Sequence, residues 1–349
     1  MALQYKRFQD VNLQDPFFDS LKSDYKEFSD WFTRKASERA YVFENDDGSI
    51  QAFLYLKIED GEVADVSPPL PPARRLKVGT LKINPHGTRL GERFIKKVFD
   101  HAVQQGVTSI YVTAFDKHAK LIEMFERYGF EKRAEKTTAN GTEWVLLKDM
   151  LAMPADLVAR YPRVALKGAN IYLLSLYPEW HTRLLPDSIL RTESEDIVQD
   201  VSHTNSIHKV YLAAMKGMEN LRPGDVLLIY RTGDQKGSAE YRSVVTSVGV
   251  IEEYRNIQSF PNEAEFLNYC SSYSIFTEQE LRGFWKHRKY PHVIRFTYNF
   301  ALKKRLNRHT LIEEVGLNRG DYFGFLKLTH TQFQNIIARS EVDASLVVN

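Results

Sequence analysis

The residues best suited to chemistry lie around two glycines, Gly87 and Gly91, in the stretch "PHGTRLG". The run "LKVGTLKIN" before them predicts a strand, and "ERFIKKVFDHAVQQG" after them has the apolar spacing of a helix. A glycine turn between a strand and a helix points several free backbone N–H groups at one spot, where a pyrophosphate can be held. The same glycines also suit an ordinary turn, so both interpretations stay open.

Further elements surround this turn. Residues 14 to 36 place aromatic side chains at helical spacing behind Asp15 and Pro16, which predicts one or two amphipathic helices. The sequence "DDGS" between β-rich runs predicts a hairpin, and a second hairpin is predicted around Asn140 and Gly141. Between the hairpins, "SIYVTAF" predicts a strand and "KHAKLIEMFERYGF" a helix. Together they predict a mixed α/β domain that ends near Asp149.

The run from Leu76 to Phe130 resembles the core of the GNAT acetyltransferases. The matching pieces are "LKIN", "HGTRLGERFIKK" and "MFERYGF", and the resemblance extends over residues 10 to 149. It implies a GNAT-like mixed sheet with helices over residues 1–150, with acetyl-CoA as its acyl-CoA cofactor. The residues that it implies for cofactor binding are Leu81, Lys82 and Ile83 along the pantetheine arm, and Gly87, Thr88, Arg89, Leu90 and Gly91 around the pyrophosphate.

The resemblance does not supply a complete acid–base set. Many members have a tyrosine where this chain has Phe125, and a phenyl ring cannot protonate a departing thiolate. Tyr128 and His118 on the same predicted helix are candidates, although a core aromatic residue and a surface histidine are the plainer interpretations. Glu143, with Asp116, is a candidate base. The catalytic residues therefore stay unknown at this stage.

From Asn170 onward, short β-rich runs predict a small β-barrel decorated by helices. Residues 151–168 contain Pro154 and Pro162 and are predicted to form a linker. The pieces "NIYLLSLYPEWHTRLL", "KVYLAAM" and "LRPGDVLLIYRTG" resemble the PUA-like superfamily, in particular ASCH modules. The resemblance implies a PUA-like β-barrel over residues 169–349 that binds RNA. The Gly-x-Lys-x-x-Glu-x-Arg signature of hydrolytic ASCH members is not visible, so that activity is not expected.

Positive charge is concentrated in the second half, since no Asp or Glu lies between Leu281 and Arg308. Aromatic residues alternate with the cations there, and cations with aromatic rings suit single-stranded RNA. The alternative is that "HVIRFTYNF" buries its apolar residues while its arginine is solvated. The residues predicted to contact nucleic acid are Lys286, Arg288, Lys289, Arg295, Lys303, Lys304 and Arg305.

Composition excludes several classes of protein. The 349 residues carry a net charge of +2, and no apolar run approaches the ~20 residues of a membrane span. A single cysteine, Cys270, and the absence of a secretory pattern predict a cytoplasmic protein. His203, His208, His287 and His292 lack a ligand pattern, so no metal is predicted.

Two functional hypotheses follow. The first is an acetyl-CoA-dependent N-acetyltransferase that acts on an amine of RNA, a nucleobase, an aminoacyl group or an RNA-associated protein. The second is a catalytically weak GNAT-like protein that binds a protein partner, for example an antitoxin-like component of a bacterial toxin–antitoxin module. Phe125 favours the second hypothesis, and the order of strand, turn and helix favours binding of the cofactor.

Overall fold

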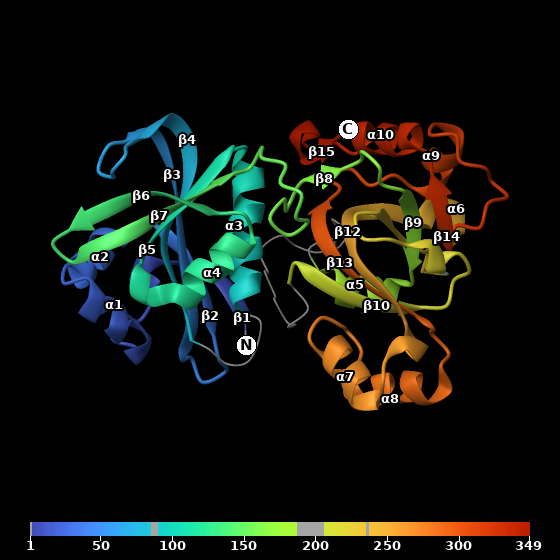
Figure 1. Ribbon diagram of the computed structural model, residues 1–349, viewed down its shortest axis with the longest axis horizontal. Coiled ribbons are helices and arrows are strands. Elements are labelled where there is room, and N and C mark those ends of the chain that lie inside the picture. The colour runs from blue at the N-terminus through green and yellow to red at the C-terminus, as the bar shows by residue number, and fades with distance from the viewer. Residues whose placement is uncertain (1, 85–89, 187–205, 235–236) are drawn as a thin grey trace. The chain divides into compact units, whose positions relative to one another are not determined.

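The computed structural model describes residues 2–84, 90–186, 206–234 and 237–349 (Figure 1). The chain folds into two compact units, of which the first runs to Pro154 and the second starts at Ala155. Both units are mixed α/β structures. Gly87, Thr88 and Arg89 lie outside the described residues. Among the helices that the structure describes, none combines the length and the apolar character of a bilayer span.

The first unit is built on a seven-stranded sheet with the order β1-β2-β3-β4-β5-β7-β6. Its strands are β1 Ala2–Arg7, β2 Arg39–Glu44, β3 Ile50–Val63, β4 Leu70–Ile83, β5 Ser109–Phe115, β6 Glu131–Thr138 and β7 Gly141–Asp149. The pair β4–β5 is parallel and the other neighbours are antiparallel. The two predicted hairpins are confirmed as β2–β3 and β6–β7. Gly48 and Gly141 have positive φ in their turns, which explains the Asp-Gly and Asn-Gly signals.

Helices cover both faces of this sheet. They are α1 Asp19–Asp24, α2 Phe28–Arg34, α3 Leu90–Gln105 and α4 Ala119–Arg127, and Figure 1 shows α1 and α2 grouped apart from α3 and α4. Phe53 and Tyr55 of β3 pack with the aromatic residues of the α1–α2 region. Side chains alternate along a strand, so Leu54 and its neighbours point to the opposite face, which α3 covers with its buried residues. Asp15 accepts a hydrogen bond from the backbone N–H of Phe17, as its predicted role as N-cap requires.

The second unit contains a six-stranded mixed sheet with the order β10-β13-β12-β11-β9-β14. Its strands are β9 Ile171–Leu176, β10 His208–Ala213, β11 Val226–Arg231, β12 Val244–Asn256, β13 His292–Ala301 and β14 Phe325–Leu328. Its helices are α5 Pro178–Leu184, α6 Ala239–Arg242, α7 Glu263–Ser271, α8 Glu278–His287, α9 Arg308–Glu313 and α10 His330–Arg339. Strands β9 and β11 are parallel, and the other neighbours are antiparallel.

The sheet of the second unit is open, so the predicted barrel does not close among the described strands. The edge strands β10 and β14 are not hydrogen-bonded to each other. The outer edge of β10 is engaged elsewhere, because the N–H of Val210 donates to the carbonyl of Tyr273, which follows α7. Strand β14 has four residues, which leaves little edge for a further strand.

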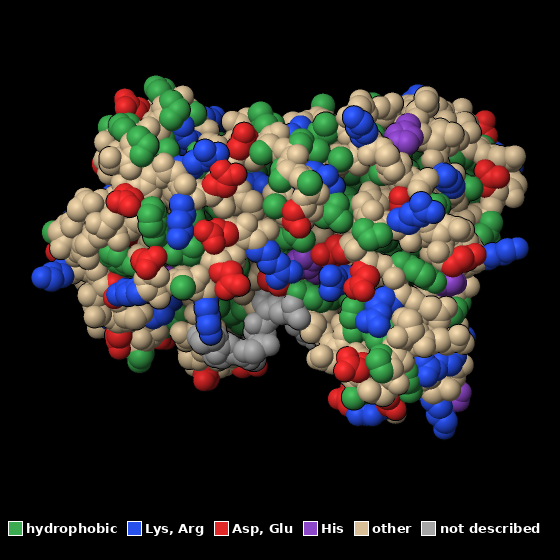
Figure 2. Space-filling view, viewed as in Figure 1, with side chains coloured by type: hydrophobic (Ala, Val, Ile, Leu, Met, Phe, Trp, Pro, Cys, Tyr) green, Lys and Arg blue, Asp and Glu red, His purple; other side chains and the backbone are tan. Residues whose placement is uncertain are grey.

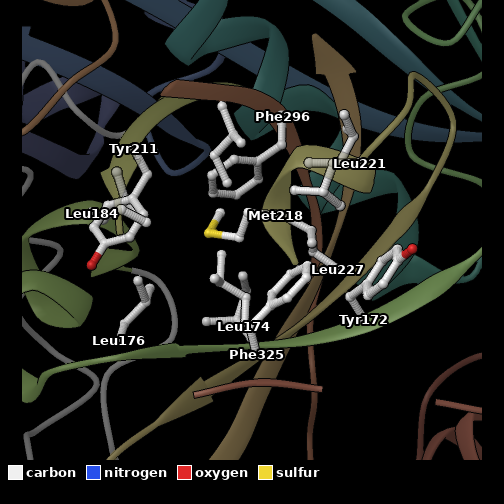
Figure 3. Packing of buried hydrophobic residues seen from close by; sticks show 14 of the residues in the cluster. Tyr172, Leu174, Leu176, Leu184, Tyr211, Met218, Leu221, Leu227, Phe296 and Phe325 are labelled. Atoms are coloured by element: carbon white, nitrogen blue, oxygen red, sulfur yellow. The ribbon is translucent and has the colours of Figure 1, made fainter. Parts of the chain in front are cut away.

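An apolar core packs against one face of this sheet. In Figure 3 the Met218 thioether lies in the middle, with Phe296 on one side and Leu174 and Phe325 on the other. The rings of Tyr172 and Phe325 stack at 4.9 Å between centroids. Side chains from β9, β13 and β14 therefore meet in one cluster, which holds the strands in register.

Much of the predicted linker is part of the second unit. Tyr161 is buried and donates its hydroxyl to the carbonyl of Tyr298, at 3.1 Å. Asn299 donates its amide to the carbonyl of Pro162, at 3.0 Å. Strand β8, Val164–Ala165, then pairs with β15, Val347–Val348. From Tyr161 the chain is thus anchored rather than extended.

The thiol of Cys270 can be used to test how helices α7 and α8 pack against β10. Its side chain is fully buried among Phe266, Leu281 and Val293, and burial raises the pKa of its thiol to about 12. Because the thiolate is the nucleophile, iodoacetamide should leave the native protein unlabelled at pH 8 and label it in concentrated urea. Mass spectrometry follows the labelling. Equal labelling rates in native buffer and in urea would contradict this packing.

Candidate functional site

The main irregularity of the first unit lies between β4 and β5. In the described structure these strands pair over four residues, from Arg75 opposite Ser109 to Val78 opposite Val112. Beyond that point β4 continues along β3 as far as Ile83, and β5 continues along β7 as far as Phe115. The two strands therefore part and leave facing backbone edges without a strand partner. Such edges can form hydrogen bonds with an extended amide-containing ligand.

A bulge at Gly79 accompanies the separation. On β3, Tyr55 pairs with Thr80 and Leu56 pairs with Val78, so Gly79 has no partner in the ladder. A Cβ at Gly79 would lie 2.7 Å from Cδ1 of the Tyr55 ring. Only glycine fits this close approach without moving a buried tyrosine, and the bulge turns the end of β4 away from β5.

The structure places the predicted cofactor residues around this opening. Ile83 lies on the same face as Leu81, near the start of α3. Lys82 points to the opposite face, where its ammonium donates to the carbonyl of Phe17 and, at 2.6 Å, to Oγ of Ser20. Leu90 is buried and begins α3, next to Gly91. The other predicted cofactor residues, Gly87, Thr88 and Arg89, lie outside the described residues.

A hollow of about 270 Å³ lies beside the N-terminus of α3. The residues that line it come from α3, from α4 and from the residue after α4: Gly91, Glu92, Lys120, Glu123, Met124, Arg127 and Tyr128. Gly91 allows the two helices to approach, because a Cβ there would lie 2.9 Å from the Met124 sulfur. Arg127 is 3.3 Å from Glu92, whereas Lys120 has no ion pair within the described ranges. The helix N-terminus and the cations favour an anionic group here.

Tyr128 does not come together with the other predicted catalytic candidates. Tyr128 is fully buried, lines the α3–α4 hollow and lies 6.2 Å from the Phe99 ring. Glu143 is on β7, opposite Phe115, and its buried carboxylate accepts a hydrogen bond of 2.6 Å from the hydroxyl of Tyr25. Since Tyr25 belongs to the α1–α2 side and Tyr128 to the α3–α4 side, they lie on opposite faces of the sheet.

Glu143 instead lies near a second hollow, of about 500 Å³, at the end of β5. Its lining residues are Ser23, Asp24, Phe115, Asp116, Lys117 and Asn140. The ring of Tyr25 is 5.3 Å from that of Phe115, which connects the Tyr25–Glu143 pair to this hollow. His118 is half-exposed, with Nε2 3.4 Å from Oδ2 of Asp24. We refer to this site as the acidic hollow.

The charges at the acidic hollow are mostly in hydrogen bonds or ion pairs. Asp24 is 2.5 Å from the ammonium of Lys117, and Asp116 accepts a hydrogen bond of 3.1 Å from the Trp144 indole. Burial, followed by the hydrogen bond to Glu143, raises the pKa of the Tyr25 hydroxyl well above its usual range. Tyr25 thus stays protonated at physiological pH and can donate a hydrogen bond.

Sequence reasoning missed Tyr25 and Asp24. The spacing of Tyr25 predicts a core position on an amphipathic helix, and 118 positions in the chain separate it from Glu143. A carboxylate at the end of a short helix, such as Asp24 at the end of α1, has no distinct local pattern. The sequence offers one signal for this site. The predicted topology brings the end of "SIYVTAF" next to the strand that contains Glu143.

The predicted nucleic-acid residues of the second unit form separate groups. Lys286, Arg288 and Lys289 lie at the end of α8 or just beyond it, whereas Lys303, Lys304 and Arg305 follow β13. The ten residues of β13 separate the groups by roughly 30 Å. The visible face of this unit mixes Lys and Arg with Asp and Glu (Figure 2).

Several of the predicted contact residues are also engaged within the protein. Arg295 is 3.4 Å from Glu252, and the Arg288 guanidinium lies 3.4 Å from the centre of the Trp285 ring. Phe296 and Tyr298 are buried. The predicted contact residues therefore lie in separate groups in the described structure, and the apolar residues of β13 are buried.

Among the residues that the structure describes, one group has the spacing of metal ligands. Ligand atoms of Glu240, His309 and Glu313 lie within 4.8 Å of one another. However, His309 is 2.9 Å from Glu240, and Arg319 forms ion pairs with both glutamates. These ion pairs account for the cluster. Of the histidines considered in the sequence, His208 pairs with Glu252 at 2.8 Å, and His203 lies outside the described residues.

Comparison with known proteins adds partial likenesses. No protein-family model matches the chain, and no curated protein matches it significantly. Among solved structures, the chain is similar to ASCH from Zymomonas mobilis, with 12% identity and a TM-score of 0.31, over 48% of this chain and 94% of that one. It is also similar to Naa20 from Chaetomium thermophilum, solved in complex with a bisubstrate analogue, with 16% identity and a TM-score of 0.31, over 43% and 87% of the two chains.

A third similar structure is a spermidine N-acetyltransferase variant from Vibrio cholerae, with 10% identity and a TM-score of 0.30, over 42% of this chain and 94% of that one. Similar structures thus include both an ASCH protein and N-acetyltransferases. Each covers less than half of this chain.

Substitution of Gly79 tests the geometry of the opening. Gly79→Ala should lower the free energy of unfolding by about 1–3 kcal/mol, because the new methyl group overlaps the buried Tyr55 ring. The measurement is urea denaturation followed by circular dichroism. Gly283→Ala on α8 is the control, since no atom lies within 4 Å of the added Cβ. An unchanged midpoint for Gly79→Ala would contradict the described bulge.

Proposed function

We propose that the first unit is an acetyl-CoA-dependent N-acetyltransferase. The observation that carries this proposal is the separation of β4 from β5 after Val78 and Val112, next to the N-terminus of α3. This arrangement provides free strand edges and a helix N-terminus in sequence order. An extended amide chain that ends in a pyrophosphate matches both features.

The residues present fit this cofactor. The free edge of β4 at Leu81 and Ile83 would hold the amide arm, and the start of α3 at Leu90 and Gly91 would hold phosphate. Lys120 stands at the α3–α4 hollow, where it would neutralise a phosphate. When bound, the cofactor supplies an acetyl thioester.

An amine acceptor fits the acidic hollow. Transfer forms an N–C bond and breaks a C–S bond, while the amine loses a proton and the departing sulfur gains one. In this proposal the carboxylate of Glu143 accepts the proton of the amine, and the hydroxyl of Tyr25, which is hydrogen-bonded to that carboxylate, donates one to the sulfur. We infer that this pair performs the role that Phe125 and the buried Tyr128 do not. The acceptor amine belongs to an RNA, a nucleobase, an aminoacyl group or an RNA-associated protein.

Calorimetry with acetyl-CoA tests the cofactor. The full-length chain should bind one equivalent, and Lys120→Glu should weaken binding roughly 5- to 50-fold through lost attraction to phosphate. Lys167→Glu, an exposed charge reversal in the second unit, is the matched control. Absence of any heat of binding for the unmodified chain would refute the acetyltransferase proposal.

Kinetics test the proton-transfer pair. Glu143→Gln and Tyr25→Phe should each lower kcat by about 10²- to 10⁴-fold, with acetyl-CoA affinity unchanged. The assay is transfer of radiolabelled acetyl groups to total tRNA, aminoacyl-tRNA and a peptide pool. Tyr128→Phe is the matched comparison. A large loss for Tyr128→Phe with none for Tyr25→Phe would reverse the assignment.

A second candidate function is binding without catalysis, in which the unit acts as a regulatory protein with a protein partner. The specific observation in its favour is Phe125, which is fully buried and packs at 4.8 Å against Phe130. Acetyl-CoA binding without transfer to any acceptor pool would support this alternative.

A further inference from the structure

The acidic hollow contains an amine of the chain itself. Of the residues that line it in the described structure, Lys117 alone carries an amino group. The Lys117 ammonium is 2.5 Å from the Asp24 carboxylate and 5.3 Å from the centre of the Phe115 ring. A lysine side chain therefore lies in the hollow where the proposed function places the acceptor amine.

The strand that leads to Lys117 borders the opening between β4 and β5. Beyond Val112, β5 no longer pairs with β4, and it ends at Phe115, which only Asp116 separates from Lys117. The ring of Tyr25 lies 5.3 Å from that of Phe115, and the Lys117 ammonium lies at the same distance from it. The amine and the hydrogen-bonded pair of Tyr25 and Glu143 are thus next to one ring, at the end of the open strand edge.

The Lys117 ammonium is both anchored and accessible. Asp24, which anchors it, has 14% of its side chain exposed, whereas 57% of the Lys117 side chain is exposed. The other carboxylate oxygen of Asp24 lies 3.4 Å from Nε2 of His118, so Asp24 holds two successive residues of the segment after β5. An amine that a partly buried carboxylate already positions has less orientational freedom to lose when it reacts than one that is free in solvent.

Two other lysines of the first unit are useful comparisons. Lys82 lies on the α1–α2 side of the sheet, but its ammonium donates to the Phe17 carbonyl and to Oγ of Ser20, and it does not line the hollow. Burial lowers the pKa of Lys82, which makes its amine easier to deprotonate. Lys26 follows Tyr25 directly and is exposed, yet it does not line the hollow either. Exposure or pKa alone would favour acylation of these two residues, whereas position in the hollow favours Lys117.

We propose that Lys117 is a self-acetylation site, to which the first unit transfers an acetyl group within its own chain. This inference rests on the proposed acetyltransferase function. The bond between Nζ and the acetyl carbon forms, and the C–S bond of the thioester breaks. The ammonium loses one proton before the attack and the amine loses a second after it, of which one goes to the departing sulfur and one to solvent. Acetylation removes the charge of Lys117 and with it the ion pair to Asp24.

Peptide mass spectrometry of the full-length chain incubated with acetyl-CoA tests this proposal. Acetyl-Lys117 should form at a first-order rate that does not depend on protein concentration, roughly 10- to 100-fold faster than acetyl-Lys26, because the amine is already in place. Glu143→Gln should slow acetylation of Lys117 by about 10²- to 10⁴-fold and leave the slow reaction of Lys26 unchanged. Lys117→Arg keeps a cation beside Asp24 and should abolish the fast phase. Circular dichroism checks that both variants are folded.

A second measurement does not depend on turnover. Sulfosuccinimidyl acetate, added without acetyl-CoA, should label the accessible amine of Lys117. A thioether analogue of acetyl-CoA, which cannot transfer its acyl group, should remove most of this labelling, because the bound analogue would cover the amine. Labelling of Lys26 should stay the same with and without the analogue.

The results distinguish this proposal from the proposed function. If calorimetry shows that acetyl-CoA binds, but Lys117 is acetylated no faster than Lys26, self-acetylation is wrong, and the acceptor pools alone decide whether the unit is a transferase. A rate that rises with protein concentration, an equal rate in Glu143→Gln, faster acetylation of Lys82, or no protection by the bound analogue would also overturn self-acetylation. Absence of acetyl-CoA binding would refute both proposals.

Discussion

The close approach of Gly79 to the Tyr55 ring is the constraint on which the first unit depends. It produces the bulge in β4, and the bulge coincides with the point where β4 leaves β5. On one side of the opening lie the start of α3 and the α3–α4 hollow, and on the other side lie Tyr25 and Glu143. In the proposed transferase, the cofactor and the acceptor would therefore approach the same gap from different faces of the sheet.

Local signals predicted local structure well. The Asp-Gly and Asn-Gly hairpins, the N-cap at Asp15 and the two helices that follow the strands of the first unit are where the sequence places them. Each depends on the backbone preferences of a few adjacent residues. The mixed α/β class was predictable for the same reason, because alternating periods of two and 3.6 residues distinguish strands from helices.

Features that depend on distant contacts were not predictable. The second sheet does not close among the described strands, and the edge of β10 bonds instead to the carbonyl of Tyr273, a contact with no local sequence signal. The cations between Leu281 and Arg308 are contiguous in sequence, yet one strand carries them to opposite ends of the unit. Conversely, Asp24, Phe115 and Asn140 are scattered in sequence and line one hollow. Strand direction, rather than sequence proximity, decides which side chains act together.

The hydrogen bond between Val210 and Tyr273 also bears on self-association. An open sheet presents two edges to which strands of other molecules can add, and long bare edges promote aggregation. In the second unit, helices α7 and α8 pack over β10, and this contact occupies a donor on its outer edge. The opposite edge, β14, is four residues long and offers little length for strand addition. The helices that pack over β10 and the shortness of β14 thus leave little of either edge available to a strand of another molecule.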